Sequence, residues 1–205
     1  MMSTVFTKSY DTPEIDGREI LRYAGARSED AATVDLLREC VAEVGHLLSY
    51  KVAYVEAEVS VSEGDLVDLG FVSVRSSSLK KQLDGCSSAV IFAATVGIEL
   101  DRRIARYSRV SPSRALMLQA FGTERIEALC DAFCEDIKKE KALLKKGVKG
   151  RFSAGYGDLP LEMQRDIFAL LDCPKRIGLS LNESLLMSPT KSVTAIVGIT
   201  DASDE

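Results

Sequence analysis

The segment SAVIFAATVGIELDRRIARYSRVSPSRALMLQAFGTERIEALCDAFCEDI, residues 88–137, determines the class of fold. Its first eight residues, 88–95, are nearly all apolar, which is typical of a central strand that is covered on both faces. Ser111 and Pro112 then supply a capping hydroxyl and a proline at the first helical position. Apolar residues recur at helical spacing over the rest of the segment, which predicts a helix of about 25–30 residues, bent or interrupted at Gly122.

Shorter elements are predicted on both sides of this segment. Helices and strands are mixed without a regular strand–helix–strand alternation, so we expect an α+β fold: a mixed, mostly antiparallel sheet packed by helices, with one long helix, in a single domain of residues 1–205. Residues 1–14 and 200–205 are expected to be loose ends, although the first ten also fit an edge strand. The predicted helices are 29–49 (capped by Ser28), 76–83, 98–107 and 161–171, and the predicted strands are 51–62, 66–74 (bent at Gly70), 177–181 and 192–199.

Composition excludes several classes of protein. The formal net charge is -5 and the sequence pI is about 5.1, which argues against a partner recognised through a phosphate backbone, so no nucleic acid is expected. No stretch approaches the roughly 18 apolar residues that span a bilayer, so no membrane partner is expected either. The N-terminus lacks the basic and apolar regions of a secretory signal, and we therefore expect a cytoplasmic protein.

The cysteines and the histidine do not indicate a disulfide framework, a metal site or a catalytic triad. The five cysteines are an odd number and do not suggest a disulfide framework. Cys130 and Cys134 are four residues apart, so a helix would place both on one face, either as a metal or redox pair or as two buried apolar thiols. A cluster of the radical type needs a third nearby cysteine, which is missing, so we expect buried thiols. His46 is the one histidine, which leaves little for a histidine-rich metal site or a catalytic triad.

The stretch RFSAGYGDLP, residues 151–160, has no periodicity and reads as a loop. The guanidinium of Arg151 can grip a carboxylate with two parallel hydrogen bonds. Ala154 and Gly155 allow a ligand to approach the backbone, and Tyr156 offers a ring for stacking. A ligand with a carboxylate, an ammonium group and an adenine ring would suit these residues. An ordinary turn could have the same composition, so the residues alone leave both interpretations open.

The segments RFSAGYGDLPLEMQRDIFALLD and IGLSLNESLLMSPTKSVTAIVGI resemble the C-terminal activation domain of cobalamin-dependent methionine synthase. The family pattern has R-x-x-x-G-Y, a proline four residues later, a helix, G-x-x-L-[TN]-E-S, M-x-P and a serine-containing strand. Order and spacing agree over about 50 residues. A weaker similarity, to the family's R-x-x-E-A-x-x-[ED] helix, lies at 124–137. The matching positions are Arg151, Gly155, Tyr156, Pro160, Gly178, Leu181, Asn182, Glu183, Ser184, Met187, Pro189 and Ser192.

This resemblance implies an α+β fold that binds S-adenosylmethionine in a shallow groove. By the same resemblance, Arg151 binds the carboxylate of the ligand, the backbone of 152–156, including Ala154 and Gly155, lines the adenosyl part, and Tyr156 packs near it. By the same resemblance, Glu183 of the G-x-x-L-[TN]-E-S motif is also predicted to bind the ligand. No catalytic side chain and no metal ligand is predicted.

The resemblance also implies a reaction and partners. Cobalamin that has oxidised to cob(II)alamin receives one electron from a flavodoxin-like or ferredoxin-like protein and is methylated by S-adenosylmethionine. A D-x-H-x-x-G cobalamin motif does not occur in this sequence, so cobalamin is expected on a partner, either methionine synthase or another corrinoid protein. We therefore expect a stand-alone module that acts in trans. Methyltransferase-type activity would require that partner, because the protein supplies geometry and the cofactor supplies the chemistry.

Three departures from the family pattern leave an alternative open. Lys145 stands where the family has an acidic residue, a second acidic residue near the N-terminal end has no located equivalent, and the family's paired tyrosines after the last strand are missing before Glu205. The pocket is then either thinner or completed by Glu127 or Asp158. The alternative is a corrinoid-protein interaction module with a decayed ligand site. An unrelated methyltransferase would need a glycine-rich loop after its first strand, and none is present.

Overall fold

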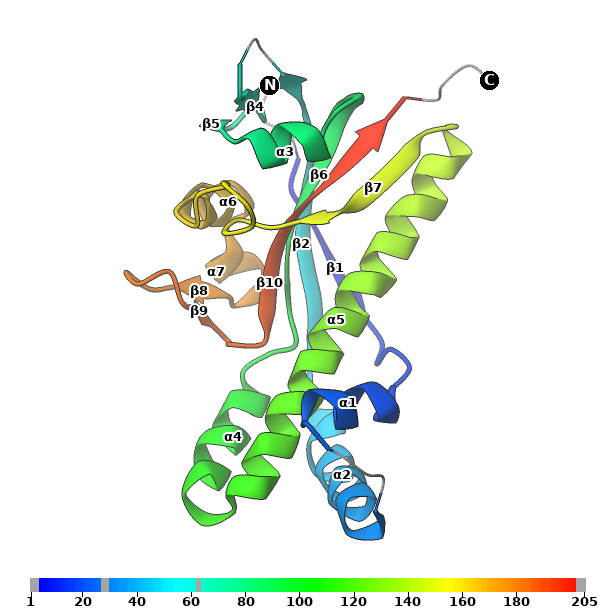
Figure 1. The fold of residues 1–205 in the computed structure, drawn as a ribbon, viewed down its shortest axis with the longest axis vertical. Coiled ribbons are helices and arrows are strands. Elements are labelled where there is room, and N and C mark those ends of the chain that lie inside the picture. Colours follow the sequence, from blue (N-terminus) through cyan, green and yellow to red (C-terminus); the bar gives the residue numbers. More distant parts are fainter. Residues whose placement is uncertain (1–3, 27–29, 62–63, 202–205) are drawn as a thin grey trace.

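A computed structural model describes residues 4–26, 30–61 and 64–201 and has an α+β architecture (Figure 1). Its main sheet has five strands in the order β1-β2-β6-β10-β7, and each neighbouring pair is antiparallel. The predicted fold class is therefore confirmed. The strands of this sheet are β1 (Phe6–Tyr10), β2 (Tyr50–Glu58), β6 (Cys86–Thr95), β7 (Gly147–Phe152) and β10 (Ser192–Thr200). The smaller strands are β3 (Ser60–Val61), β4 (Leu66–Asp68), β5 (Ser73–Arg75), β8 (Ser180–Leu181) and β9 (Met187–Ser188).

Helices cover both faces of the sheet. The long helix α5 (Pro112–Leu143) runs diagonally across one face, and α1, α2 and α4 gather around its N-terminal half (Figure 1). Helices α6 and α7 pack on the opposite face. The remaining helices are α1 (Gly17–Tyr23), α2 (Ala31–Val44), α3 (Ser77–Gln82), α4 (Glu99–Val110), α6 (Met163–Leu171), α7 (Cys173–Ile177) and the 3-10 turn at Gly45–Leu47.

Strand β6 lies at the centre of the sheet, as its apolar sequence predicts. Phe92 and Ala94 belong to the core under α5, whereas Ile91 and Ala93 belong to the core under α6. This alternation follows from the two-residue period of a strand, which sends successive side chains to opposite faces. A strand that is buried on both faces therefore needs a continuous apolar run.

Strand β7 covers only the second half of β10. Its pairing with β10 extends from Ile196↔Phe152 to Thr200↔Gly147, and residues 192–195 have no β7 partner. The backbone N–H of Val96 donates to the carbonyl of Lys191 at 3.2 Å, which orients the peptide groups of Lys191 towards β6. Because these directions alternate along a strand, the N–H and C=O groups of Ser192 and Thr194 face the uncovered side. The sheet thus has an open edge immediately beyond the end of β7.

Several predicted elements need correction. Residues 1–14 are not wholly a loose end: the alternative of an edge strand agrees with β1, which pairs with β2 from Phe6↔Tyr54 to Tyr10↔Tyr50 at the edge of the sheet. The predicted strand 177–181 is shorter in the structure: Ile177 ends the helix α7 (Cys173–Ile177), and strand β8 comprises Ser180–Leu181. The predicted cap Ser28 lies outside the described residues, and the carboxylate of Asp30 caps α2 by accepting from the Thr33 N–H at 2.9 Å.

Gly122 does not interrupt the long helix, which continues for 32 residues. A Cβ atom at Gly122 would lie 2.3 Å from Leu100 Cδ2, so the glycine allows α4 and α5 to approach closely. The glycines that follow this helix, Gly147 and Gly150, belong to β7. Arg151 is likewise on a strand, at its penultimate position, and not in a loop.

Candidate functional site

A hollow of about 480 Å³ lies at the uncovered edge of β10. It is bounded by α5, the end of β7, the segment that follows β7, the start of α6 and strand β9. Because β7 ends at Phe152, the side chains and backbone of the first half of β10 reach this space. The lining residues are Glu127, Arg151, Ser153, Ala154, Tyr156, Gln164, Met187, Ser192, Val193 and Thr194.

Arg151 is held at one side of this hollow by two carboxylates from α5. Its Nη2 atom donates to Glu127 Oε2 at 3.0 Å and to Asp131 Oδ1 at 2.9 Å. Within the described residues, Nε and Nη1 have no hydrogen-bond partner. Burial opposes the positive charge, but Cys130, Glu127 and Asp131 outweigh it and leave the pKa of Arg151 raised. The guanidinium is thus anchored and charged, with two donors left for a ligand.

The backbone after Arg151 turns back sharply. Gly155 has φ +89°, a conformation that side chains with a Cβ rarely adopt, and its N–H donates to the carbonyl of Leu159 at 2.9 Å. This turn places Ala154 and Tyr156 at the hollow, while Gly155 itself is exposed beside them. Tyr156 is 61% exposed, and its ring meets that of Phe152 at 83°, an edge contact that leaves a ring face for stacking.

The structure brings together three of the five predicted binding residues, Arg151, Ala154 and Tyr156, around one hollow. Gly155 shapes it without lining it. Glu183 is exposed in the turn between β8 and β9, where its carbonyl accepts from Arg165 Nη2 at 2.8 Å, and it does not line the hollow.

The two acids considered as completing the pocket have separate roles. Glu127 lines the hollow and contacts Arg151. Asp158 instead caps α3, because its carboxylate accepts hydrogen bonds from the hydroxyl groups of Ser76 and Ser77 and from the N–H groups of Ser77 and Ser78, at 2.5–3.0 Å. Lys145 lies beyond the end of α5 and does not line the hollow.

Gln164 and Thr194, which were not predicted from the sequence, are both buried and both line the hollow. A signal for Gln164 was available. With Ile167, Phe168 and Leu171 it lies on the buried stripe of α6, where a polar side chain is unusual. Thr194 gave no such signal, because its place at an open edge depends on where β7 ends.

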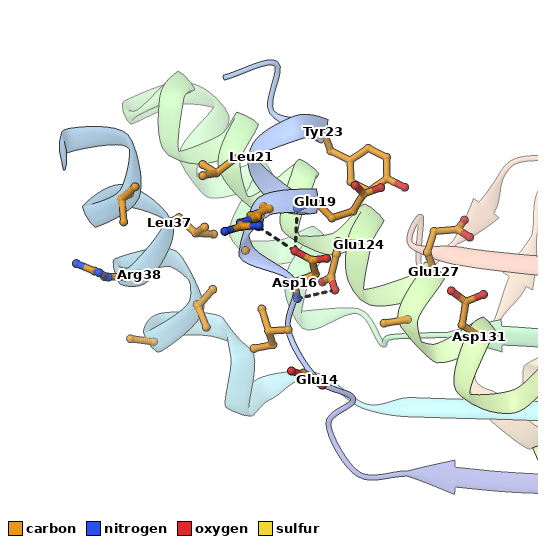
Figure 2. A pocket seen from close by; sticks show the side chains of 17 residues that line it. Glu14, Asp16, Glu19, Leu21, Tyr23, Leu37, Arg38, Glu124, Glu127 and Asp131 are labelled. Atoms are coloured by element: carbon orange, nitrogen blue, oxygen red, sulfur yellow. Dashed lines mark hydrogen bonds between the residues drawn. The ribbon is translucent and has the colours of Figure 1, made fainter. Parts of the chain in front are cut away.

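A larger groove of about 1290 Å³ lies between α1, α2 and α5 (Figure 2). Six of its lining residues are acidic, but most of these carboxylates already have a partner. Asp16 accepts from the N–H groups of Arg18 and Glu19, Glu19 pairs with Arg22, and Glu124 pairs with the fully buried Arg125. Glu127 and Asp131 of this groove are the partners of Arg151, and Glu127 lines both the groove and the hollow.

The cysteines are free thiols. Cys130 is buried, which raises its pKa to about 12, and the pKa of Cys134 is raised for the same reason. Among the described residues, no group of three or more histidine, cysteine or acidic side chains is placed to hold a metal ion.

Comparison with known proteins identifies the family. Residues 79–205 match the family model of the vitamin B12-dependent methionine synthase activation domain. This match covers more than half of the chain and includes the segment that forms the hollow. The chain belongs to this activation-domain family. The resemblance noted in its sequence is therefore confirmed.

A solved structure supports the activation-domain fold over the remaining residues as well. The crystal structure of the MetH reactivation domain bound to AdoHcy matches with a TM-score of 0.73 at 14% identity, covering 99% of this chain and 80% of that chain. At this identity the likeness concerns the fold. A search of curated protein sequences found no match. In the described part of this activation domain, no helix is both long and apolar enough to cross a membrane.

Proposed function

We propose that this activation domain binds S-adenosylmethionine in the hollow at the β10 edge and supplies its methyl group to reduced cobalamin on a corrinoid partner. The reaction is the reductive methylation of cob(II)alamin, which returns a cobalamin-dependent methionine synthase, or a related corrinoid methyltransferase, to its active form. The observation that carries this proposal is the anchored Arg151, which keeps two guanidinium donors free beside a hollow large enough for a ligand.

The lining residues match the two ends of the ligand. Nε and Nη1 of Arg151 keep N–H donors for single charge-assisted hydrogen bonds to the carboxylate. Glu127 lies beside the guanidinium and can pair with the ammonium group on the same carbon atom. Tyr156 offers a free ring face, and the turn at Gly155 keeps the backbone low so that the adenosyl part can lie against it. The AdoHcy carried by the structurally similar domain is the product of such a methyl transfer.

No proton transfer is required of the protein. The methyl group of a sulfonium leaves without an acid or a base, and cobalamin supplies the nucleophile. The domain has to hold the methyl group in line with the cobalt atom and exclude water. Orientation of this kind generally lowers the activation free energy by several kcal/mol. The absence of a histidine or carboxylate dyad from the lining residues fits this role.

The proposal includes partners. Residues 1–205 contain no D-x-H-x-x-G cobalamin motif. The proposed source of cobalamin is a corrinoid protein on which this domain acts in trans. A flavodoxin-like or ferredoxin-like protein supplies the electron. A cytoplasmic location belongs to the same proposal.

Two observations favour a second function, a corrinoid-protein interaction module without ligand binding. Glu127 and Asp131 both form ion pairs with Arg151, and Glu183 lies outside the hollow. A ligand carboxylate would have to share the guanidinium with these two acids.

Calorimetry with S-adenosylmethionine and S-adenosylhomocysteine distinguishes the two functions. The wild-type protein should bind both at sub-millimolar concentration. Arg151→Ala should weaken binding by about tenfold or more, because a charge-assisted hydrogen bond to the carboxylate is lost. Arg114→Ala is the matched control, since Arg114 also pairs with two carboxylates, Glu39 and Glu43, but lines neither hollow.

Two results would count against the proposal. Equal affinities of the wild type and Arg151→Ala would show that the ligand does not bind in this hollow. No heat from the wild type, together with capture of a corrinoid protein that is independent of ligand, would support the interaction module.

A further inference from the structure

Gln164 is a buried polar side chain whose hydrogen bonds are incomplete. The residue is 6% exposed, and its Oε1 atom is covered and has no hydrogen-bond partner among the residues that the structure describes. The same side chain lines the hollow at the β10 edge. Buried carbonyl oxygens are nearly always paired, because leaving one unpaired costs free energy. A glutamine on the apolar stripe of α6 is therefore best explained by a partner that enters the hollow.

The hollow has two ends that lie on opposite faces of the sheet. Glu127 comes from α5, which packs on one face, and Gln164 comes from α6, which packs on the other. The hollow connects them past the open edge of β10, at Ser192 and Thr194. A long ligand whose carboxylate is held by Arg151 on the α5 side can extend through the hollow as far as Gln164.

We propose that the amide of Gln164 recognises the adenine ring, with Oε1 accepting a hydrogen bond from the 6-amino group and Nε2 donating to the adjacent ring nitrogen. A glutamine amide matches this donor and acceptor pair of adenine. The last side-chain torsion of glutamine is soft, so the amide can rotate to present Oε1 and Nε2 to a ligand in the hollow. This inference rests on the proposed function, because the ligand must be an adenosyl compound.

The first test changes the ligand and leaves the protein intact. S-Adenosylhomocysteine is compared with its analogue that carries hydrogen in place of the 6-amino group, with identical sulfur, ribose and amino-acid parts. The wild type should bind the adenosyl compound about tenfold more tightly, because the analogue leaves Oε1 unpaired. Equal affinities would overturn the assignment of Gln164.

The second test changes the residue. Gln164→Met keeps the length of the side chain and removes the amide, so the preference for the adenosyl compound should fall to within about twofold. The unliganded variant should unfold at the same temperature as the wild type or a higher one, because an unpaired buried oxygen has been removed. A purely structural role for Gln164 predicts the opposite, namely a less stable protein with an unchanged preference.

Tyr50→Phe is the matched control. The Tyr50 hydroxyl is also buried without a partner in the described part of the chain, but Tyr50 lines neither hollow. Its removal should leave the preference for the adenosyl compound unchanged. A preference that survives in Gln164→Met would overturn this inference alone. Failure of the wild type to bind either compound would overturn the proposed function and this inference with it.

Discussion

Arg151 and Asp158, seven residues apart, are charged side chains with different tasks. Arg151 uses one of its nitrogen atoms for two acids of α5 and keeps the others for the hollow. Asp158 uses both carboxylate oxygens for the start of α3. Free hydrogen-bonding capacity separates a candidate binding residue from a structural one, although both lie in the segment that resembles the family.

Asp158→Asn should lower the thermal unfolding midpoint. Hydrogen bonds from Ser76, Ser77 and Ser78 hold the pKa of Asp158 well below its usual range. The stabilisation by the charged form is therefore complete above the ordinary aspartate pKa of about 3.9 and is lost as the pH falls through the lower folded-state pKa. The difference between variant and wild type should be equal at pH 8 and pH 6 and should shrink below pH 4, as measured by circular dichroism.

Asp84→Asn is the control for this prediction. Asp84 is exposed just after α3, and its side chain forms no hydrogen bond with any described residue. The control should leave the unfolding midpoint nearly unchanged. A loss of stability in Asp158→Asn that grows at acidic pH would contradict the capping role.

At the scale of elements, the length of β7 makes the site possible. A longer β7 would pair with residues 192–195 and close the edge of β10. Because β7 ends at Phe152 and the chain turns at Gly155, the edge stays open and α6 begins beside it. The hollow thus lies where β10 lacks a pairing strand, and side chains from both faces of the sheet line it.

Gly122→Ala should destabilise the contact between α4 and α5. Alanine favours an isolated helix over glycine by about 1 kcal/mol. Here its Cβ would lie 2.3 Å from Leu100 Cδ2 and 2.9 Å from Lys191 Cγ, and Leu100 is fully buried. Overpacking of this kind costs about 1–3 kcal/mol, so the free energy of unfolding in urea should fall.

Gly45→Ala provides the comparison, because its Cβ would lie 3.8 Å from the nearest atom, Val41 Cγ1, which is an ordinary contact. It should be neutral or slightly stabilising. An increase in stability for Gly122→Ala would show that α4 and α5 can separate without cost.

At the scale of the whole molecule, two cores share one sheet. Strands β6 and β10 contribute alternate side chains to the core under α5 and to the core under α6. If β6 left the sheet, apolar side chains of both cores would be exposed to water. We therefore expect the described part of the protein to unfold in one cooperative transition.

Ile91→Ala and Phe92→Ala test this coupling, because these neighbouring, fully buried residues belong to different cores. Each should lower stability by about 2–5 kcal/mol. In both variants, unfolding curves from far-UV and near-UV circular dichroism should still coincide. Separate transitions in either variant would show that the two faces fold independently.

The sequence by itself determined the α+β class, the central strand, the long helix and the arginine of the site. These features are encoded locally, by periodicity, by a helix cap and by the spacing of a family motif. Local patterns predicted the short elements less accurately. Ile177 was predicted as strand but ends the helix α7, and β1 is ordered because it pairs with β2.

Only the tertiary structure decided which side chains surround Arg151. Glu127 and Asp131 precede it by 24 and 20 residues, and Gln164 reaches the hollow from the other face of the sheet. Glu183, which belongs to the family motif, lies outside the hollow. A binding site depends on which segments meet in space, and that follows from strand order and from where β7 ends, which no local pattern encodes.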